Sequence, residues 1–337
     1  MAESNALLKI NEIQKSDSAL WNSFVDSSPQ GTFFHTTTWA DIISTTFGRS
    51  YNIILCMRNE QPVGGMIFFP HKKLIWKMIT PTAFFPYCAP IFYRPVDEKS
   101  QKTIQNKLNI TASFENYLRN YYDYWILDIS PSSKDIRSYL WKGATAEPRY
   151  SYVVSLKNSE EIIDNFNQSI RKKLKQAENQ RAVVKESTDP KLLIDLISKS
   201  YRRHGMKPIV SEDHLRSFLS KVIDLDQVKL FYLELNEKIT AGRLVVVDKL
   251  TAYDLLAGSD DHTGFGSAYL VASILKKFAV TIEHFDFLGA DHPQIEQFKR
   301  GFGGELTQGF RITNKPKLPL SWIISLYRNH LFREREL

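Results

Sequence analysis

The sequence has few cysteines, few glycines and prolines, and no unbroken apolar run long enough to cross a membrane. Only Cys56 and Cys88 occur in 337 residues, so a disulfide framework is excluded, and no Cys/His spacing suits a structural zinc ion. The most apolar stretch, residues 74–93, is interrupted by a lysine and three prolines, which predicts buried loops and strands. Gly 15 and Pro 14 are too few for a low-complexity chain.

Several common catalytic motifs are also absent. The sequence contains no Gly-x-Ser-x-Gly elbow, no Walker loop, no dinucleotide-binding glycine pattern and no His-Glu-x-x-His. The usual hydrolase, NTPase, dehydrogenase and zinc-protease interpretations therefore lose their main support. The first twenty residues lack a basic segment leading into an apolar run, so we expect no secretory signal and a cytoplasmic location.

The composition that is present is globular, with 43% hydrophobic and 24% charged residues, and the length is enough for about two domains. The formal net charge of +7 favours polyanionic partners such as RNA, nucleotides or an anionic membrane surface. A solvated basic surface without a partner would give the same charge, so its placement matters more than its total.

A faint internal repeat divides the chain. The segment 54–67 and the segment 232–245, offset by 177 residues, each read as a strand, an Asn-Glu turn, a glycine and a second strand. Further on, 125–128 and 283–286 both read as a buried strand ending in an aspartate. Two repeated patterns in the same order predict duplicated α/β units with a boundary near residue 150.

Three helices are predicted from apolar spacing. Residues 101–122 have a helical pattern that is interrupted at 109–111, and residues 267–279 have apolar side chains at every fourth position. Between them, Asn158 and Glu161 form a capping-box-like start of an amphipathic helix that carries four basic residues.

A glycine-bearing loop connects the predicted strand 251–257 to the helix near 267. Gly264, Gly266 and Ser267 would place backbone N–H groups at the helix N-terminus, which suits a phosphate or a carbonyl oxygen. An ordinary β-to-α connection has the same pattern.

The most specific signal lies near the C-terminus. The segments Phe285–Ala290 (FDFLGA) and Phe298–Gly304 (FKRGFGG) resemble the closing signature of the Fem-type peptidoglycan-bridge aminoacyltransferases and of the wider FemAB-like and BioF2-like acyltransferases. Shorter matches occur at 34–39, 170–174 and 201–205, so the resemblance extends over most of the chain.

The resemblance implies an α/β fold with mixed sheets, built as two tandem GNAT-like domains. Residues 1–150 would form the first, acceptor-side domain and residues 151–317 the second, donor-side domain. Residues 318–337 would form a C-terminal helix that packs back on the domains, or makes a peripheral membrane contact through its basic tail.

The implied activity is transfer of an aminoacyl or acyl group onto an amine of a cell-envelope or glycan precursor. The favoured donor is a charged tRNA, with no metal and no tightly bound cofactor. In GNAT acetyltransferases the loop before the corresponding helix begins with Gln or Arg and holds the coenzyme A pyrophosphate. Here Asp260 and Asp261 stand at that place, which disfavours coenzyme A unless the chain turns them away.

Two alternatives stay open. One is an acyl-coenzyme A or acyl-carrier-protein dependent N-acyltransferase that acts on an amino sugar. The other is a non-catalytic binding module of the same fold.

The resemblance also assigns candidate site residues. Lys299 matches the lysine of the family's Phe-Lys pair, and its ammonium would stabilise a phosphate or the developing oxyanion. The candidate donor-binding residues are Phe298, Gly264, Gly266, Ser267 and Asp286. The candidate acceptor-binding residues are Tyr87, Arg171, Lys173 and Trp39.

Overall fold

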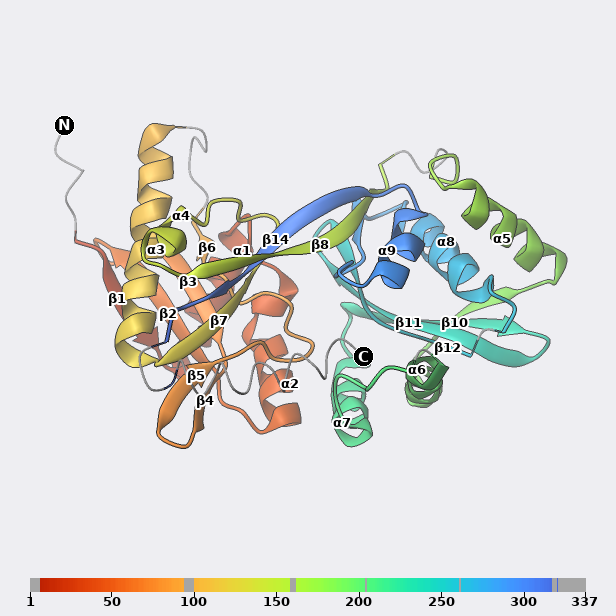
Figure 1. Cartoon of the computed structure of the whole chain (residues 1–337), viewed down its shortest axis with the longest axis horizontal. Helices are drawn as coiled ribbons and strands as arrows, with labels where there is room; N and C mark the ends of the chain where they lie inside the picture. The colour runs from red at the N-terminus through yellow and green to blue at the C-terminus, as the bar shows by residue number, and fades with distance from the viewer. Residues whose placement is uncertain are drawn as a thin grey trace. The chain divides into compact units, whose positions relative to one another are not determined.

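The computed structural model of the chain (Figure 1) describes residues 7–93, 100–157, 162–203, 205–260, 262–316 and 320. These residues form two compact units. The first contains the described residues up to Pro148 together with those from Gln308 onward, and the second runs from Arg149 to Thr307. The sequence assigned residues up to 317 to the second domain, whereas the structure gives the segment from Gln308 to the first unit.

The first unit contains mixed α/β structure. Its antiparallel sheet has the order β1-β2-β3-β6, with the strands β1 (Lys9–Ile13), β2 (Asn52–Arg58), β3 (Gln61–Phe68) and β6 (Ile91–Phe92). A second set of paired strands comprises β4 (Pro70–Lys73), β5 (Trp76–Ile79), β7 (Tyr124–Ile129) and the end of β14 (Glu305–Thr313). The helices are α1 (Ser18–Ser27), α2 (Thr37–Phe47), α3 (Gln101–Tyr121) and α4 (Arg137–Trp141), with short 3-10 turns at Lys15–Asp17 and Phe33–His35.

The second unit is built around one mixed sheet of order β9-β10-β11-β12-β13-β8. Its strands are β8 (Thr145–Ser155), β9 (Val183–Ser187), β10 (Val228–Leu235), β11 (Lys238–Asp248), β12 (Thr251–Ser259) and β13 (His284–Asp286). Its helices are α5 (Gln168–Asn179), α6 (Lys191–Arg203), α7 (Glu212–Val222), α8 (Gly266–Phe278) and α9 (Pro293–Arg300). Figure 1 shows α6 and α7 on one side of this sheet and α5, α8 and α9 on the other.

The internal repeat is confirmed by the two hairpins. Both turns have left-handed backbone angles, with φ of 48° and 63° at Asn59 and Glu60 and of 49° and 61° at Asn236 and Glu237. Such angles are typical of the two-residue turns that match the twist of paired strands. A register shift lies at the same relative position before each turn, between Cys56 and Met57 in one hairpin and between Leu233 and Glu234 in the other. The two hairpins therefore share their turn geometry and their strand register.

The glycines that the repeat aligned have a packing role. A Cβ on Gly65 would lie 2.5 Å from Cζ3 of Trp21 in α1, and a Cβ on Gly242 would lie 3.1 Å from Cδ1 of Leu193 in α6 and 2.8 Å from the Tyr232 ring. Each glycine thus lets a helix approach the second strand of its hairpin.

Two strands were not placed by the sequence. β8 follows the elements of the first repeat, yet its residues Val153–Ser155 pair with β13 of the second unit. Conversely, Phe310–Thr313 of β14 pair with Ile126–Ile129 of β7 in the first unit. The closing strand of each repeat therefore completes the sheet of the other.

The helix boundaries differ from expectation at two places. Helix α3 is continuous through 109–111, where Ile110 is buried and the Thr111 hydroxyl donates to the Lys107 carbonyl oxygen at 2.8 Å. Helix α5 begins at Gln168, because the Asn167 side chain accepts the Ile170 N–H at 2.8 Å. The start predicted at Asn158 and Glu161 lies outside the described residues, and residues 162–165 form turns.

The helix predicted over 318–337 lies outside the described residues except for Leu320, which is buried. Within the described part of the chain, no helix has the length and hydrophobicity needed to span a bilayer.

The hairpin packing predicts the effect of adding one methyl group. Gly242→Ala should lower the free energy of unfolding by about 1–3 kcal/mol, because the added Cβ overlaps Tyr232 and Leu193. Asn236→Gly in the adjoining turn, where glycine accepts the backbone angles, is the matched control and should have a much smaller effect. The urea denaturation midpoints of the two variants and of the wild type measure both effects. A midpoint of Gly242→Ala equal to that of the wild type would refute the packing role.

Candidate active site in the second unit

The two parallel strands of the second unit separate at a defined point. β12 and β13 pair only from Thr251 to Tyr253 on β12, and the last pair is Tyr253 with Asp286. β12 then continues to Ser259, with a bulge between residues 254 and 256 that shifts its register against β11. Beyond the last pair, β12 continues without β13 as its neighbour, and the chain leads on to helix α8.

Lys299 projects from α9 toward the loop that follows β13. Its Nζ donates to the carbonyl oxygens of Phe287 and Gly289, at 2.7 and 2.5 Å, and lies 5.7 Å from the centroid of the Phe287 ring. Desolvation lowers the pKa of Lys299 to about 8, an effect that the nearby Asp254 charge opposes and the Arg243 charge reinforces. The ammonium is therefore partly buried, held in place and close to its titration range at neutral pH.

A buried ion pair lies beside this lysine. The Arg243 guanidinium on β11 donates to Oδ2 of Asp254 on β12, and their side chains are only 7% and 3% exposed. The guanidinium also lies 5.7 Å from the centroid of the Phe298 ring. Few globular proteins bury such charges without a partner or a function.

Asp286 closes the cluster at the end of β13. It accepts the Ser151 hydroxyl from β8 at 2.5 Å and the Leu288 N–H at 2.8 Å. Burial raises the pKa of Asp286, although both hydrogen bonds and the Lys299 charge act in the opposite direction. The residues Leu288 and Gly289, with φ of 50° and 109°, form the tight loop that brings two carbonyls to Lys299.

The Phe-Lys-Arg-Gly-Phe-Gly-Gly segment fixes α9 against α5. The Gly301 carbonyl accepts the Asn167 N–H at 2.9 Å, and Gly303 has φ of 72° with its Cα so close to Asn165 that a Cβ would lie 2.4 Å from the Asn165 oxygen. Phe298 packs on Phe302 with ring centroids 5.2 Å apart. The signature that suggested the family thus positions Lys299.

The predicted donor loop leads into α8. Gly264 has φ of 76° and Gly266 is the first, buried residue of the helix, with Ser267 next to it. Asp260 is turned toward Lys199 on α6, whose Nζ lies 2.8 Å from Oδ2, and this contact lowers the pKa of Asp260. Asp261 lies outside the described residues.

The predicted acceptor residues fall in both units. Arg171 is exposed and Lys173 is partly exposed on α5 of the second unit. Tyr87 is partly exposed in the first unit. Trp39 is fully buried there, and its indole N–H donates to the Phe84 carbonyl oxygen at 2.9 Å. Trp39 therefore supports the loop before Tyr87 and has no surface for a substrate, in contrast to the role expected from the sequence.

In the first unit, the point where the parallel strands β5 and β7 separate is occupied by another segment of the same chain. β5 and β7 pair at Ile79 and Trp125, after which the Cys88 N–H donates to the Asp128 carbonyl oxygen at 3.1 Å. Cys88 is buried, which raises the pKa of its thiol to about 12. Arg311 pairs with both carboxylate oxygens of Asp128, at 2.7 and 2.8 Å. The corresponding position in the first unit is thus closed by its own chain.

Sequence reasoning missed Arg243 and Asp254. Each is a charged residue inside an otherwise apolar strand, in AGRLVVV and TAYDLLA respectively. A buried strand rarely accommodates such a residue, so this contrast was the available signal.

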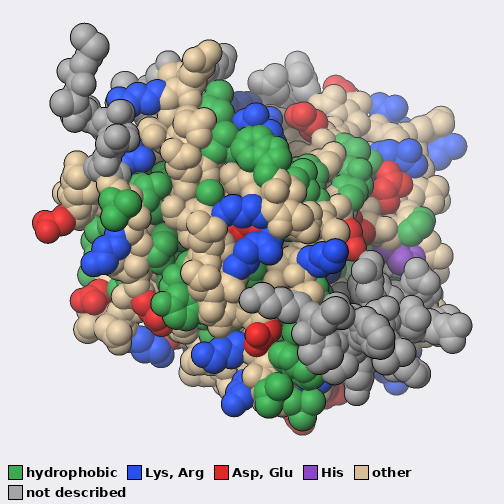
Figure 2. Space-filling model, turned by 60° about the vertical axis from the view of Figure 1, so that its left-hand side comes forward, with side chains coloured by type: hydrophobic (Ala, Val, Ile, Leu, Met, Phe, Trp, Pro, Cys, Tyr) green, Lys and Arg blue, Asp and Glu red, His purple; other side chains and the backbone are tan. Residues whose placement is uncertain are grey.

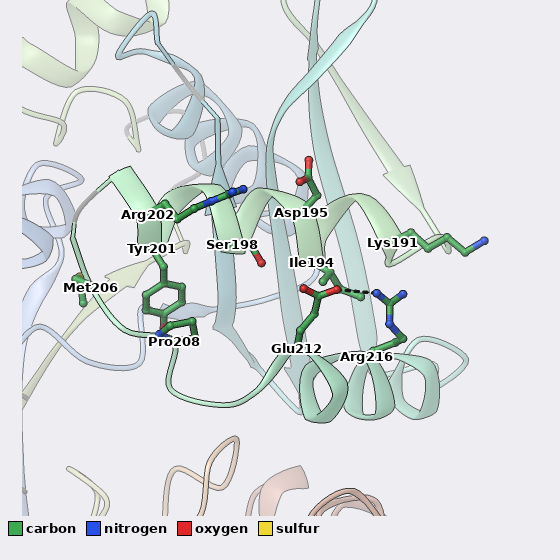
Figure 3. A pocket seen from close by; sticks show the side chains of 10 residues that line it. All are labelled: Lys191, Ile194, Asp195, Ser198, Tyr201, Arg202, Met206, Pro208, Glu212 and Arg216. Carbon is green, nitrogen blue, oxygen red and sulfur yellow. Dashed lines mark hydrogen bonds and ion pairs between the residues drawn. The ribbon is translucent and has the colours of Figure 1, made fainter. Parts of the chain in front are cut away.

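A separate cavity of about 430 Å³ lies between α6 and α7 (Figure 3). Its lining residues are Lys191, Ile194, Asp195, Ser198, Tyr201, Arg202, Met206, Pro208, Glu212 and Arg216. Glu212 pairs with Arg216 at 2.8 Å, and Asp195 pairs with Lys199 at 3.0 Å, so its acidic groups already have partners. Among the described residues, no group of three or more His, Cys, Asp or Glu side chains is arranged to hold a metal ion.

Comparison with known proteins identifies the fold. Residues 164–300 match the family model of the acetyltransferase (GNAT) domain. The solved structure of FemX superimposes with a TM-score of 0.66 at 15% identity, covering 89% of this chain and 96% of FemX. The chain has the double GNAT fold of FemX. The GNAT match lies wholly within the second unit, contains the candidate site and supports acyltransferase function.

Two further solved structures have similar coverage. The C-terminal domain of a lysylphosphatidylglycerol synthetase from Agrobacterium fabrum has a TM-score of 0.57 at 13% identity, covering 93% of this chain and 96% of that one. L-PGS from Bacillus licheniformis has a TM-score of 0.52 at 11% identity, covering 92% and 96%. No curated protein sequence matches the chain.

The burial of Lys299 predicts a pH-dependent contribution to stability. Its pKa is lowered from 10.5 to about 8 in the folded chain, so the unfolded chain binds more protons between these values and stability contributed by this residue rises with pH across that window. The stability of the wild type relative to Lys299→Met should therefore increase from pH 7.5 to 10. Lys172→Met, on the exposed surface of α5, is the control. Urea titrations at both pH values measure the difference, and a pH-independent difference would contradict the buried ammonium.

Proposed function

We propose that this double-GNAT acyltransferase transfers an aminoacyl group from a charged tRNA onto a primary amine of a cell-envelope or glycan precursor, in the cytoplasm. The observation that carries the proposal is the partly buried Lys299 ammonium beside the point where β12 and β13 separate. A cation at that point stabilises negative charge that develops on an ester carbonyl.

The reaction requires few groups from the protein. The uncharged acceptor amine attacks the ester carbonyl carbon, the new C–N bond forms, and the ester C–O bond to the terminal ribose breaks. The proton lost by the amine ends on the released ribose hydroxyl. Lys299 supplies positive charge to the tetrahedral oxyanion, and the N-terminus of α8 after Gly264 supplies further N–H donors.

Two features favour a charged tRNA as donor. Helix α5, which is anchored to the Lys299 segment through Gly301, carries Arg171, Lys172, Lys173 and Lys175. One protein of similar structure is named a lysylphosphatidylglycerol synthetase, and lysyl is an aminoacyl group.

The total charge does not by itself locate the RNA contact. On the face shown in Figure 2, Lys and Arg side chains are scattered, with Asp and Glu between them. The basic residues of α5 are therefore singled out by their position next to the α9 segment and not by the net charge of +7.

Each alternative has one supporting observation. An acyl-coenzyme A or acyl-carrier-protein dependent N-acyltransferase acting on an amino sugar is favoured by the Asp260–Lys199 contact, which turns a carboxylate away from a bound phosphate. A non-catalytic binding module is favoured by the two carbonyl acceptors that already occupy the Lys299 ammonium.

The donor is assigned by incubating the purified protein with labelled aminoacyl-tRNA or acyl-coenzyme A and an amine acceptor, with RNase-treated controls. We expect RNase-sensitive transfer from tRNA, and Lys299→Ala should slow it about 100-fold or more because the oxyanion loses its cation. Lys277→Ala, which removes an exposed lysine of α8, is the matched control. RNase-resistant transfer from acyl-coenzyme A would replace tRNA as donor, and no transfer from any donor would favour the binding module.

Retention of tRNA should also depend steeply on salt. Each phosphate contact adds about one unit to the slope of log affinity against log salt, so Arg171→Ala should reduce the slope by about 1. Lys238→Ala, at the start of β11, should leave the slope unchanged. Filter binding between 50 and 300 mM salt, about the range in which such contacts are screened, measures both variants. An unchanged slope for Arg171→Ala would remove α5 from the RNA contact.

A further inference from the structure

One oxygen of the buried Asp254 carboxylate has no hydrogen-bond partner within the part of the chain that the structure describes. Oδ2 accepts the Arg243 guanidinium, whereas Oδ1 is buried and has no hydrogen-bond donor among the described residues. The side chain is 3% exposed. A buried carboxylate oxygen without a donor destabilises the fold, so its presence at a substrate site points to a ligand that completes it.

Asp254 lies at the point in the sheet where we propose that the acyl group reacts. Asp254 directly follows Tyr253, the last residue of β12 that pairs with β13, and it adjoins the bulge in β12. Its charge acts on Lys299, which contacts the loop after β13. The unpaired oxygen therefore lies in the same charged cluster as the ammonium to which we assign oxyanion stabilisation.

The chemistry of the missing partner is restricted. It must donate a hydrogen bond, and a positive charge suits it best because the acceptor is a carboxylate. The two protein cations nearby have other contacts: Arg243 binds Oδ2, and Lys299 binds the carbonyls of Phe287 and Gly289. A primary ammonium on a substrate meets this description.

We propose that Oδ1 of Asp254 binds the free α-ammonium of an aminoacyl donor. This inference rests on the proposed function and extends it, because it explains selection of aminoacyl esters over simple acyl groups such as acetyl, which carry no amine. The acceptor amine is the other source of a primary ammonium, and the experiment separates the two sources.

The test uses stable amide analogues of aminoacyl-adenosine, 3′-aminoacylamino-3′-deoxyadenosine with glycyl, alanyl, seryl and lysyl groups, each with a free or an acetylated α-amine. Calorimetry or competition measures their dissociation constants. The wild type should bind at least one free-amine analogue about 10- to 100-fold more tightly than its N-acetyl form, the range of one charge-assisted hydrogen bond. Asp254→Asn should bring this ratio close to 1, since the amide carries no charge.

Two controls separate recognition from folding. Asp128→Asn breaks a comparable carboxylate–arginine pair in the first unit and should leave the ratio at its wild-type value. Because Asp254→Asn leaves Arg243 buried without its partner, the double variant Asp254→Asn/Arg243→Gln, which removes both charges, should also give a ratio close to 1. Circular dichroism and denaturation midpoints establish that each variant is folded.

Each outcome has one meaning. Equal binding of free and acetylated analogues by the wild type, or a preference that persists in Asp254→Asn, would overturn the inference. If the wild type has no preference but RNase-sensitive transfer still requires Asp254, the ammonium belongs to the acceptor, and the donor inference falls while the proposed function stands. A preference that Asp254→Asn abolishes supports the inference. If it occurs without transfer from any tRNA, the proposed function fails and the ammonium site stands.

Discussion

The buried Arg243–Asp254 ion pair is the constraint around which the second unit is arranged. Two charges at 7% and 3% exposure are tolerated only if each finds a partner, and removing one member of such a pair typically costs about 3–5 kcal/mol. The pair lies where β12 leaves β13, next to Lys299 and Asp286. The pair also acts on Lys299, whose pKa is lowered chiefly by desolvation, with the Asp254 charge opposing that effect and the Arg243 charge reinforcing it.

The duplicated architecture offers an internal comparison. Both units have the same hairpin, the same bulge and the same separation of parallel strands. In the first unit the position is closed by Cys88, and Arg311 satisfies both oxygens of Asp128. In the second unit Arg243 satisfies only one oxygen of Asp254. Asp128 lies on β7, which corresponds to β13, whereas Asp254 lies on β12. The two units therefore place their carboxylate–arginine pairs on different strands, and among the described residues the pair in the second unit leaves one carboxylate oxygen without a donor.

Local signals in the sequence were sufficient for some features and not for others. The hairpins were predictable because the Asn-Glu turn and the alternating strands involve neighbouring residues. The start of α5 was missed although its cap is local, because Asn158 with Glu161 offered a second capping pattern ahead of the apolar residues Ile162 and Phe166. The strands β8 and β14 were not placed because their pairing joins residues more than 130 positions apart, such as Asp286 with Val153.

The residues of the candidate site likewise differ in whether a local sequence pattern indicates them. Lys299, Phe298 and Asp286 were accessible from a short, continuous resemblance, whereas Trp39 was given a substrate role although its environment is a core. The Arg243–Asp254 pair depends on the bulge that brings Asp254 into register with Val245, and no pattern within either strand encodes that register. Whether two charged residues on neighbouring strands pair depends on the tertiary structure. The sequence alone can therefore show only that each strand contains an isolated charged residue among apolar ones.

The proximity of these groups couples substrate binding to protonation. Lys299 already has a pKa near 8 because desolvation outweighs the attraction of Asp254 and Asp286. A substrate ammonium at Oδ1 would offset part of the Asp254 charge and add a like charge to the cluster, and both effects lower the pKa of Lys299 further. Lysine protonation and ammonium binding therefore oppose one another: a protonated Lys299 weakens the binding of a cationic donor, and a bound ammonium favours the neutral lysine.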